Sequence, residues 1–522
     1  MDRRRFLRSA GAAGVALGFG PGFWQGALAA PARPGPGPYG PLVESNLAGV
    51  FLPEGFSARV IAVGGVAVGV TQQSAIEYVF PPFPDGSACY ATDDGGWVLA
   101  INSEVPRSSV LRAGLGVPAD FQTGGCSAIR FAADGTVTDA YSILTGTDGN
   151  CAGGQTPWGT WLSCEEPQVE QQFTGEWARG AVFECDPFTP SEGTALPAMG
   201  LFKHEAVAID PVNGHAFLTE DETDGTFYRY VPSAYPDLSA GTLQVPRVDQ
   251  STGGVTWFDV PDPSAADQRT AAQVEGTTLF DGGEGAWYDE GYVYFTTKND
   301  HIVWVHDIAN QTIFKLYDYA DDPTSPLGPD GPGDTSVDNV VVAPSGDLLV
   351  AEDGGNLEIC IITADTREVA AILRLEGDEH GGSEITGPSF SPDGTRLYFG
   401  SQRSGVQPEG GAGDPTGEAP ISGSGLGIAY EVTGPFRTER VGIAAVGASG
   451  QAAPISTPAP TPADPTAAPL PATGAGPAAV AAGLAVTAIA ATLRRRNAVT
   501  PPALPALTPP ALTPPAPEPP IE

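Results

Sequence analysis

Residues 156–166, TPWGTWLSCEE, end an aromatic run with a thiol and two adjacent carboxylates. A β-strand here would place two sets of side chains on opposite faces, Trp161, Ser163 and Glu165 on one and Leu162, Cys164 and Glu166 on the other. Each face would then end in a metal-capable group, which makes a metal site conceivable. The alternative is a strand whose acidic end points into water.

The elements around this stretch repeat. An apolar run, a turn containing Gly and a second β-rich run with a polar end recur at residues 95–104, 159–166, 208–222, 287–298, 341–353 and 389–403. The later copies read as hairpins, with turns at Asn213-Gly214, Glu290-Gly291, Ser345-Gly346 and Asp393-Gly394. Six such units predict an all-β fold, a six-bladed β-propeller.

A propeller brings equivalent positions of its blades to one central channel. Polar residues precede the hairpins at Lys203-His204-Glu205, Gly283-Glu284, Asp338-Asn339 and Glu384, and others end the second strands at Asn102, Glu104, 164–166, 220–222 and 352–353. Carboxylates that meet at a channel mouth repel one another unless a cation lies between them. The repeats therefore predict a central metal site, with a solvated acidic rim as the alternative.

The composition of the 522-residue chain restricts its partners. The formal net charge is -37, and the only lysines are Lys203, Lys298 and Lys315. Nucleic acid and anionic lipid would be repelled, whereas divalent cations would be attracted. An anionic substrate would need local positive charge, most economically from bound metal, although the general acidity could also serve solubility.

The cysteines show no zinc-finger spacing. They stand at Cys89, Cys126, Cys151, Cys164, Cys185 and Cys360, without a CxxC pair, which disfavours a structural zinc site. In an exported protein some of them could form disulfides, and Cys164 is the one expected to stay unpaired.

Both ends of the chain read as processing signals. Residues 1–30 contain RRxFL, an apolar stretch and an AxA site, which predict a twin-arginine signal peptide, and 31–49 form a Pro/Gly linker. After the propeller at 50–446 come a Pro/Ala/Thr-rich spacer at 447–469, an LPATG segment with an apolar run and an Arg stop at 470–496, and a Pro-rich tail at 497–522. We expect disordered termini, export through the twin-arginine translocase, and a cell-surface location with sortase and the cell wall as partners.

Five stretches resemble the PhoX family of bacterial alkaline phosphatases: residues 150–166, 202–211, 282–298, 338–353 and 387–402, of which WGTWLSCEE is the most distinctive. The resemblance implies an exported six-bladed propeller that carries Ca²⁺ and Fe³⁺ at its channel mouth and hydrolyses phosphate monoesters. Small phosphorylated substrates, no nucleic acid and a monomeric state are the corresponding expectations.

The resemblance also implies a ligand set. It makes Cys164 an iron ligand and makes five carboxylates ligands of iron or calcium, namely Glu165, Glu205, Glu284, Asp338 and Glu384. Cys164, Glu165, Glu205 and Glu284 would form the catalytic set. His204 reads as a packing residue beside Glu205.

One position departs from the family pattern. Some members have an Arg two residues before the acid of the GGE block, where it binds the substrate phosphate, and this chain has Gly282 there. Arg403, near another blade end, is a candidate for that charge. Two other functions stay open, a calcium-dependent lactonase or esterase and a wall-anchored binding propeller without catalysis.

Overall fold

The computed structural model describes residues 31–68, 77–117, 121–167, 179–329, 331, 335–404 and 425–441. The predicted signal peptide, spacer, LPATG segment and tail lie outside these residues. Within the described part of the chain, no helix combines the length and the apolar character needed to cross a membrane.

The described strands form six sheets. In chain order of their innermost strands, the first sheet contains β5 (Pro84–Ala91), β6 (Trp97–Ser103), β7 (Gly124–Phe131) and β8 (Val137–Thr147), and the second contains β9 (Asn150–Gln155), β10 (Trp161–Glu165), β11 (Val182–Cys185) and β12 (Thr194–Ala195). The third sheet contains β13 (His204–Asp210), β14 (His215–Glu220), β15 (Phe227–Ala234), β16 (Asp237–Val248) and β17 (Val255–Asp259), and the fourth contains β18 (Gly283–Asp289), β19 (Tyr292–Thr297), β20 (Ile302–Asp307) and β21 (Thr312–Asp318). The fifth sheet contains β22 (Val337–Val342), β23 (Leu348–Glu352), β24 (Glu358–Ile362) and β25 (Glu368–Leu375) with β1 (Arg33–Pro34), β2 (Leu42–Glu44) and β3 (Val50–Pro53), and the sixth contains β26 (Ile385–Phe390), β27 (Arg396–Ser401), β28 (Ile428–Thr433) and β4 (Ser57–Val63). The short helices are α3 (Ser109–Gly114), η2 (Pro197–Met199), η3 (Thr270–Ala272), η4 (Tyr319–Asp321) and η5 (Asp378–His380).

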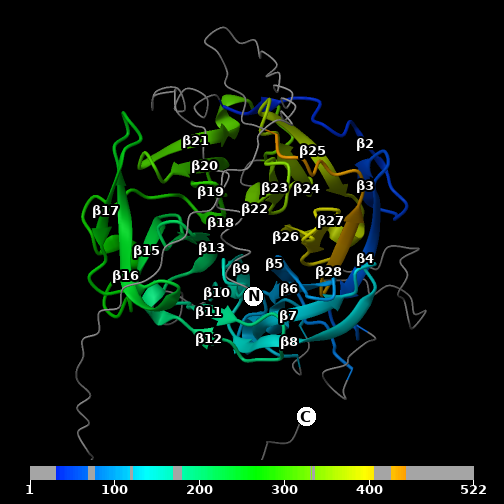
Figure 1. Ribbon diagram of the computed structural model, residues 1–522, viewed down its shortest axis with the longest axis horizontal. Coiled ribbons are helices and arrows are strands. Elements are labelled where there is room, and N and C mark those ends of the chain that lie inside the picture. The colour runs from blue at the N-terminus through cyan, green and yellow to red at the C-terminus, as the bar shows by residue number, and fades with distance from the viewer. Residues whose placement is uncertain are drawn as a thin grey trace, which may run out of the picture. The chain divides into compact units, whose positions relative to one another are not determined.

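The innermost strands close a ring. β5, β9, β13, β18, β22 and β26 each contact the next in this order, and β26 returns to β5, so the sheets radiate from a central axis (Figure 1). This arrangement is a β-propeller, as the repeats predict. The expected turns are also present, since Glu290 and Gly291 have φ of 45° and 93° and join β18 to β19 as a two-residue hairpin loop.

Apolar side chains fill the space between neighbouring sheets. One cluster combines Trp97, Leu99 and Phe131 of one sheet with Tyr398 and Ala429 of its neighbour. Five other clusters likewise combine apolar residues of neighbouring sheets. Each sheet therefore buries both faces against its neighbours, which fixes the direction in which every innermost strand enters the channel.

A strand from the amino-terminal part closes the ring. β4 pairs antiparallel with β28, so residues near 60 and near 430 share one sheet. The buried Glu431 of β28 accepts hydrogen bonds from Arg59 Nε at 2.8 Å, Arg396 Nη1 at 2.7 Å and the Tyr398 hydroxyl at 2.7 Å. One carboxylate thus ties β4, β27 and β28 together.

Replacing Glu431 tests this closure. In Glu431→Gln, two guanidinium groups lose their counter-charge, and we expect a loss of about 2 kcal/mol, below the range for a fully buried pair because Arg59 is partly exposed. The measurement is the denaturant midpoint from tryptophan fluorescence. Arg130→Met, which breaks the exposed pair with Asp94, is the control and should cost less than about 1 kcal/mol. Equal effects of the two variants would contradict the closing role.

Candidate metal centre

A β-bulge recurs where each innermost strand begins. In all six described sheets the register between the first two strands shifts there, so that two residues of the innermost strand face one residue of its partner. The two-residue bulges are Asp85-Gly86, Cys151-Ala152, Glu205-Ala206, Glu284-Gly285, Asp338-Asn339 and Gly387-Pro388. Because a bulge re-aims side chains, five of these six strands present a carboxylate or thiol at the same level.

A second set of polar residues follows the second strand of each sheet. The residue directly after the strand is Glu104, Glu166, Asp221, Lys298, Asp353 or Gln402. Four of the six positions are acids. The bulge residues and these strand-end residues together give two polar positions per sheet at one end of the channel.

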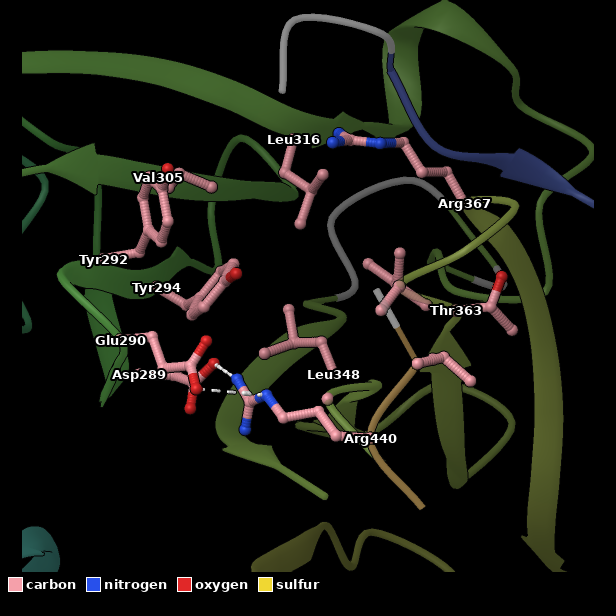
Figure 2. Close-up of a pocket in the computed structure, with 14 residues that line it drawn as sticks. Asp289, Glu290, Tyr292, Tyr294, Val305, Leu316, Leu348, Thr363, Arg367 and Arg440 are labelled. Atoms are coloured by element: carbon pink, nitrogen blue, oxygen red, sulfur yellow. Dashed lines mark hydrogen bonds and ion pairs between the residues drawn. The ribbon is translucent and has the colours of Figure 1, made fainter. Parts of the chain in front are cut away.

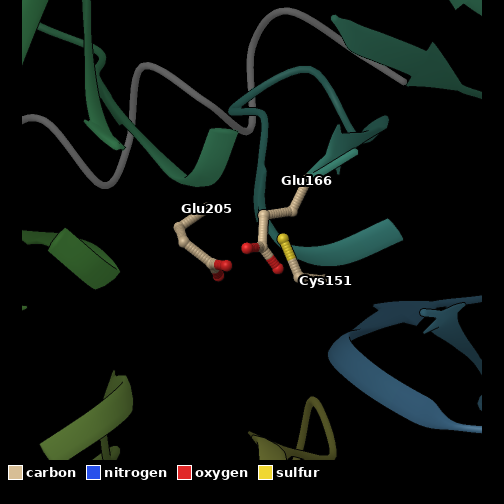
Figure 3. A group of neighbouring side chains, drawn as sticks. All are labelled: Cys151, Glu166 and Glu205. Atoms are coloured by element: carbon tan, nitrogen blue, oxygen red, sulfur yellow. The ribbon is translucent and has the colours of Figure 1, made fainter. Parts of the chain in front are cut away.

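Two groups of metal-capable atoms converge there. Among the described residues, one ligand atom each from Cys151, Glu166 and Glu205 lies within 4.8 Å of the others, and the same holds for Glu205, Asp221 and Glu284. Figure 3 shows the thiol and the two carboxylates of the first group directed toward one another. Glu205 belongs to both groups, so the two candidate sites share a ligand.

Burial and mutual repulsion make these carboxylates hard to ionise. Burial raises the pKa of Glu205, and Glu284 and Glu166 raise it further. The same two causes, burial first and neighbouring acids second, raise the pKa of Asp85, Asp338 and Glu384. Burial raises the pKa of Glu166 to about 8. A bound cation would replace these protons, so the charge of the site suits metal binding.

Three cationic side chains also reach this end of the channel. Lys203 Nζ lies 2.7 Å from Glu166 Oε1 and 3.4 Å from Asp221 Oδ2. Arg403 Nη2 lies 3.4 Å from both Glu104 Oε2 and Glu384 Oε1. Positive charge is therefore present without metal, although the composition suggested bound metal as the most economical source of it.

Lys298 is the third cation. Its Nζ lies 2.6 Å from Glu284 Oε1 and 3.1 Å from Asp221 Oδ2. Burial alone would raise the pKa of Asp221, but Lys298 and Lys203 outweigh burial and lower it to about 2. The two lysines therefore favour the ionised form of Asp221, whereas the pKa values of the neighbouring acids Glu205 and Glu284 are raised.

Gly282 has a backbone conformation that disfavours an arginine, or any other residue with a side chain, at this position. Its φ is 70°, and a Cβ there would lie 2.7 Å from Asn299 Nδ2 and 3.1 Å from Lys298 Cγ. A larger residue would be strained in both backbone and space. The cation beside this position is Lys298.

The structure brings four of the predicted ligands to the channel. Glu205, Glu284 and Asp338 occupy the bulges, and Glu384 precedes β26 beside Arg403. The signal in the sequence was that each of these acids stands shortly before a hairpin with a Gly turn.

Cys164 and Glu165 are placed elsewhere. Cys164 is the single residue opposite the Cys151-Ala152 bulge, and its side chain packs in an apolar cluster with Leu162 and Val182. Glu165 accepts hydrogen bonds from the backbone N–H groups of Asp148 and Ala181, both at 3.0 Å. Neither residue belongs to the two convergent groups of the described residues, although the resemblance implied ligand roles for both. The bulge places Cys151 in the first group, and Glu166 reaches it from the end of β10.

His204 and the cysteines have structural surroundings. The His204 ring stacks on Phe202 with a centroid distance of 3.6 Å, and burial lowers its pKa to about 3, which confirms the packing role. All six cysteines are free and buried, so the described structure contains no disulfide. Cys151 is the thiol nearest the carboxylates, and burial, Glu205 and Glu166 raise its pKa.

A cavity of about 400 Å³ lies at the opposite end of the same strands (Figure 2). It is lined by Tyr292, Tyr294, Leu348 and Arg367, and its acids Asp289 and Glu290 pair with Arg440. Neither convergent group includes a residue that lines it. The convergent thiol and carboxylates therefore lie outside this cavity.

A model of the family described as alkaline phosphatase PhoX matches residues 123–313 and 328–405, more than half of the chain. The chain belongs to the PhoX family. The PhoX match includes the bulges from Cys151 to Gly387 and the strand ends from Glu166 to Gln402. A search of curated protein sequences finds no match.

Of three similar solved structures, the first shares the fold of this PhoX chain. Pseudomonas fluorescens PhoX in complex with vanadate, a transition state analogue, is 20% identical with a TM-score of 0.56, over 80% of this chain and 100% of that one. A gluconolactonase, XC5397 from Xanthomonas campestris, is 12% identical with a TM-score of 0.39, over 76% and 99% of the two chains. The calcium-binding protein regucalcin from Agrobacterium tumefaciens is 12% identical with a TM-score of 0.35, over 74% and 98%.

Sequence reasoning missed two channel residues of this PhoX chain, Asp85 and Cys151, as ligand candidates. Glu166 and Asp221 stood among the polar strand ends that predicted the metal site but were left out of the ligand set. Cys151 and Asp85 are each the second residue of an innermost strand, the position that Glu205 also occupies. Aligning the starts of these strands in the sequence could therefore have found them. Glu166 and Asp221 follow their strands by one residue, a rule that the repeats also contain.

Metal removal should make stability depend on pH. The folded, chelated protein keeps protons on buried carboxylates that the unfolded chain releases near 4.5, so its free energy of unfolding should fall as pH rises from 7 to 8. The expected slope is about 1.4 kcal/mol per pH unit for each retained proton. Histidines ordinarily titrate near 6.5, so they contribute little in this window.

The measurement is the denaturant midpoint in chelator at several pH values. Glu166→Gln removes one titrating carboxyl and should flatten the slope, and added calcium should abolish it. A midpoint that is constant or rises between pH 7 and 8 in chelator would contradict the buried-carboxyl account.

Proposed function

We propose that this chain is a metal-dependent phosphatase that hydrolyses phosphate monoesters at the channel end of a six-bladed propeller, each of the six sheets being one blade. Membership of the PhoX family supports the reaction class. The observation that carries the proposal is the convergence of the Cys151 thiol with the buried carboxylates of Glu166 and Glu205, which come from two neighbouring sheets. A solvated acidic rim would not be buried or share ligand atoms within 4.8 Å.

The donor set suits calcium and iron. Carboxylate oxygens are the usual ligands of Ca²⁺, and a thiolate among them favours a softer ion such as Fe³⁺. We assign Cys151, Glu166 and Glu205 to iron and Asp338 and Glu384 to calcium. In this proposal Cys151 and Glu166 take the roles first given to Cys164 and Glu165.

Bound metal would supply charge stabilisation for the phosphoryl oxygens and the leaving alkoxide. The chain's own residues position the substrate. Arg403 is the best placed, because its Nε donates to Gln402 Oε1 at 2.8 Å and its backbone N–H donates to Ser383 Oγ at 3.0 Å. These bonds fix a guanidinium that is 37% exposed, which leaves N–H groups for phosphate oxygens.

The ionised carboxylates have the opposite role. They repel a phosphate dianion unless cations neutralise them, so substrate binding would depend on metal loading. Lys203 contributes to this neutralisation through its pairs with Glu166 and Asp221. The substrate would therefore bind at the cationic rim formed by Arg403 and the loaded site.

We also propose that the enzyme acts outside the cytoplasm. The RRxFL signal supports export of a folded, metal-loaded protein by the twin-arginine translocase, and the LPATG segment supports attachment to the cell wall by sortase. The net charge of -37 is consistent with small phosphorylated substrates and with no nucleic-acid partner.

The direct test is hydrolysis of p-nitrophenyl phosphate by purified, calcium- and iron-loaded protein. We expect turnover that chelator abolishes, calcium and iron restore, and vanadate inhibits. No turnover by the loaded protein would overturn the phosphatase proposal. Turnover of a lactone instead would favour the lactonase, and phosphate binding without turnover would favour a binding propeller.

The two neighbouring cysteines give a matched pair for the iron assignment. Cys151→Ser should lose most of the bound iron, because it removes the only thiol in the convergent groups of the described residues. Cys164→Ser should retain iron and lose stability instead, since it buries a hydroxyl in an apolar cluster. Elemental analysis and the unfolding midpoint separate the two effects. Iron loss in Cys164→Ser alone would restore the first assignment.

A further inference from the structure

Lys298 occupies a position that other sheets give to acids. The residue directly after the second strand is Glu104, Glu166, Asp221 or Asp353 in four described sheets, and Lys298 takes this place after β19. The chain has only three lysines in 522 residues. A cation at this position is therefore a specific departure from the repeat and from the composition.

Its ammonium group contacts acids of three neighbouring sheets. Nζ lies 2.6 Å from Glu284 Oε1 of its own sheet, 3.1 Å from Asp221 Oδ2 on one side and 3.8 Å from Asp353 Oδ2 on the other. The side chain is only 20% exposed. This contact pattern, several carboxylate oxygens around one positive centre, is the one that a metal ion would make.

The stem of Lys298 is held in place. Its backbone N–H donates to Gly282 O at 2.8 Å, and its Cγ lies 3.1 Å from the point where a Cβ of Gly282 would be. A side chain at residue 282 would push against this stem. Gly282 therefore provides the space in which Lys298 reaches the channel.

Lys203 neutralises the channel less completely. It pairs with Glu166 and Asp221, so it contacts one member of each convergent group. Lys298 contacts two of the three members of the second group, Asp221 and Glu284, and adds Asp353. Cys151 and Glu205 of the first group have no ion pair with either lysine among the described contacts.

We propose that Lys298 is a built-in cation that takes the place of one metal ion between Asp221, Glu284 and Asp353. The inference rests on the proposed metal-dependent function. Metal binding is then confined to the remaining ligands, with Cys151, Glu166 and Glu205 as the first site. Lys298 also supplies, from another strand, positive charge beside the backbone position of Gly282.

The test counts bound metal in Lys298→Met. The full-length protein is equilibrated with Ca²⁺ and Fe³⁺, separated from free ions and analysed by elemental analysis. Removal of the ammonium group leaves Glu284 and Asp353 without their counter-charge and Asp221 with Lys203 alone, so we expect one additional metal ion per chain. Lys315→Met is the matched control, because Lys315 is 46% exposed and pairs only with Asp318 among the described acids, and it should keep the wild-type count.

A second measurement uses the wild-type protein and does not depend on how the variant folds. Acetic anhydride should modify Lys315 and leave Lys298 unmodified, as read by mass spectrometry, with chelator and with Ca²⁺ alike. An unchanged metal count in folded Lys298→Met would overturn the inference. Acetylation of Lys298 only when Ca²⁺ is present would also overturn it, because it would show that metal displaces the lysine. Wild-type protein that binds no metal and hydrolyses no phosphomonoester would instead overturn the proposed function.

Discussion

Repulsion among the carboxylates at one end of the channel is the interaction on which the rest of this structure depends. Nine acids of the described residues gather there: Asp85, Glu104, Glu166, Glu205, Asp221, Glu284, Asp338, Asp353 and Glu384. Three cationic side chains, Lys203, Lys298 and Arg403, face them. The remaining negative charge must be met by protons or by metal ions, and the raised pKa values show how costly ionisation is without metal.

The fold tolerates this concentration of charge because backbone bonds, and not the acids, hold the channel together. Several bulges place a small residue against the next sheet, as where Gly86 approaches Ala152 and Gly285 approaches Asn339. Side chains of the second strands then anchor the neighbouring bulges, since Asn102 donates to the carbonyls of Cys151 and Ala152 at 2.9 and 2.7 Å. The acids are therefore held at fixed spacing before any ion binds, which is the preorganisation that a metal site needs.

Strand pattern and turn residues were enough to predict the propeller and half of the site. Glu205, Glu284, Asp338 and Glu384 could be found because each stands shortly before a hairpin whose Gly turn is visible in the sequence. Cys151 could not be found in the same way. The family resemblance implied Cys164 as the iron ligand, whereas the bulge places Cys151 in the first convergent group and Cys164 packs in the core.

Charge was the other quantity that the sequence left open. The three lysines looked too few to matter, yet the fold brings two of them to the channel, and Lys298 stands next to the Gly282 position that had raised doubt about phosphate binding. Ion pairs between residues as distant in sequence as Asp221 and Lys298 depend on how neighbouring sheets pack, which no local pattern encodes. The departure at Gly282 is thus accompanied by a nearby cation.

The most direct test of the metal centre is an anomalous-difference map at the iron absorption edge from crystals of the loaded protein. The account predicts an iron peak within bonding distance of Cys151 Sγ and of the Glu166 and Glu205 carboxylates. A peak beside Cys164, or a channel end without any metal peak in loaded crystals, would contradict it.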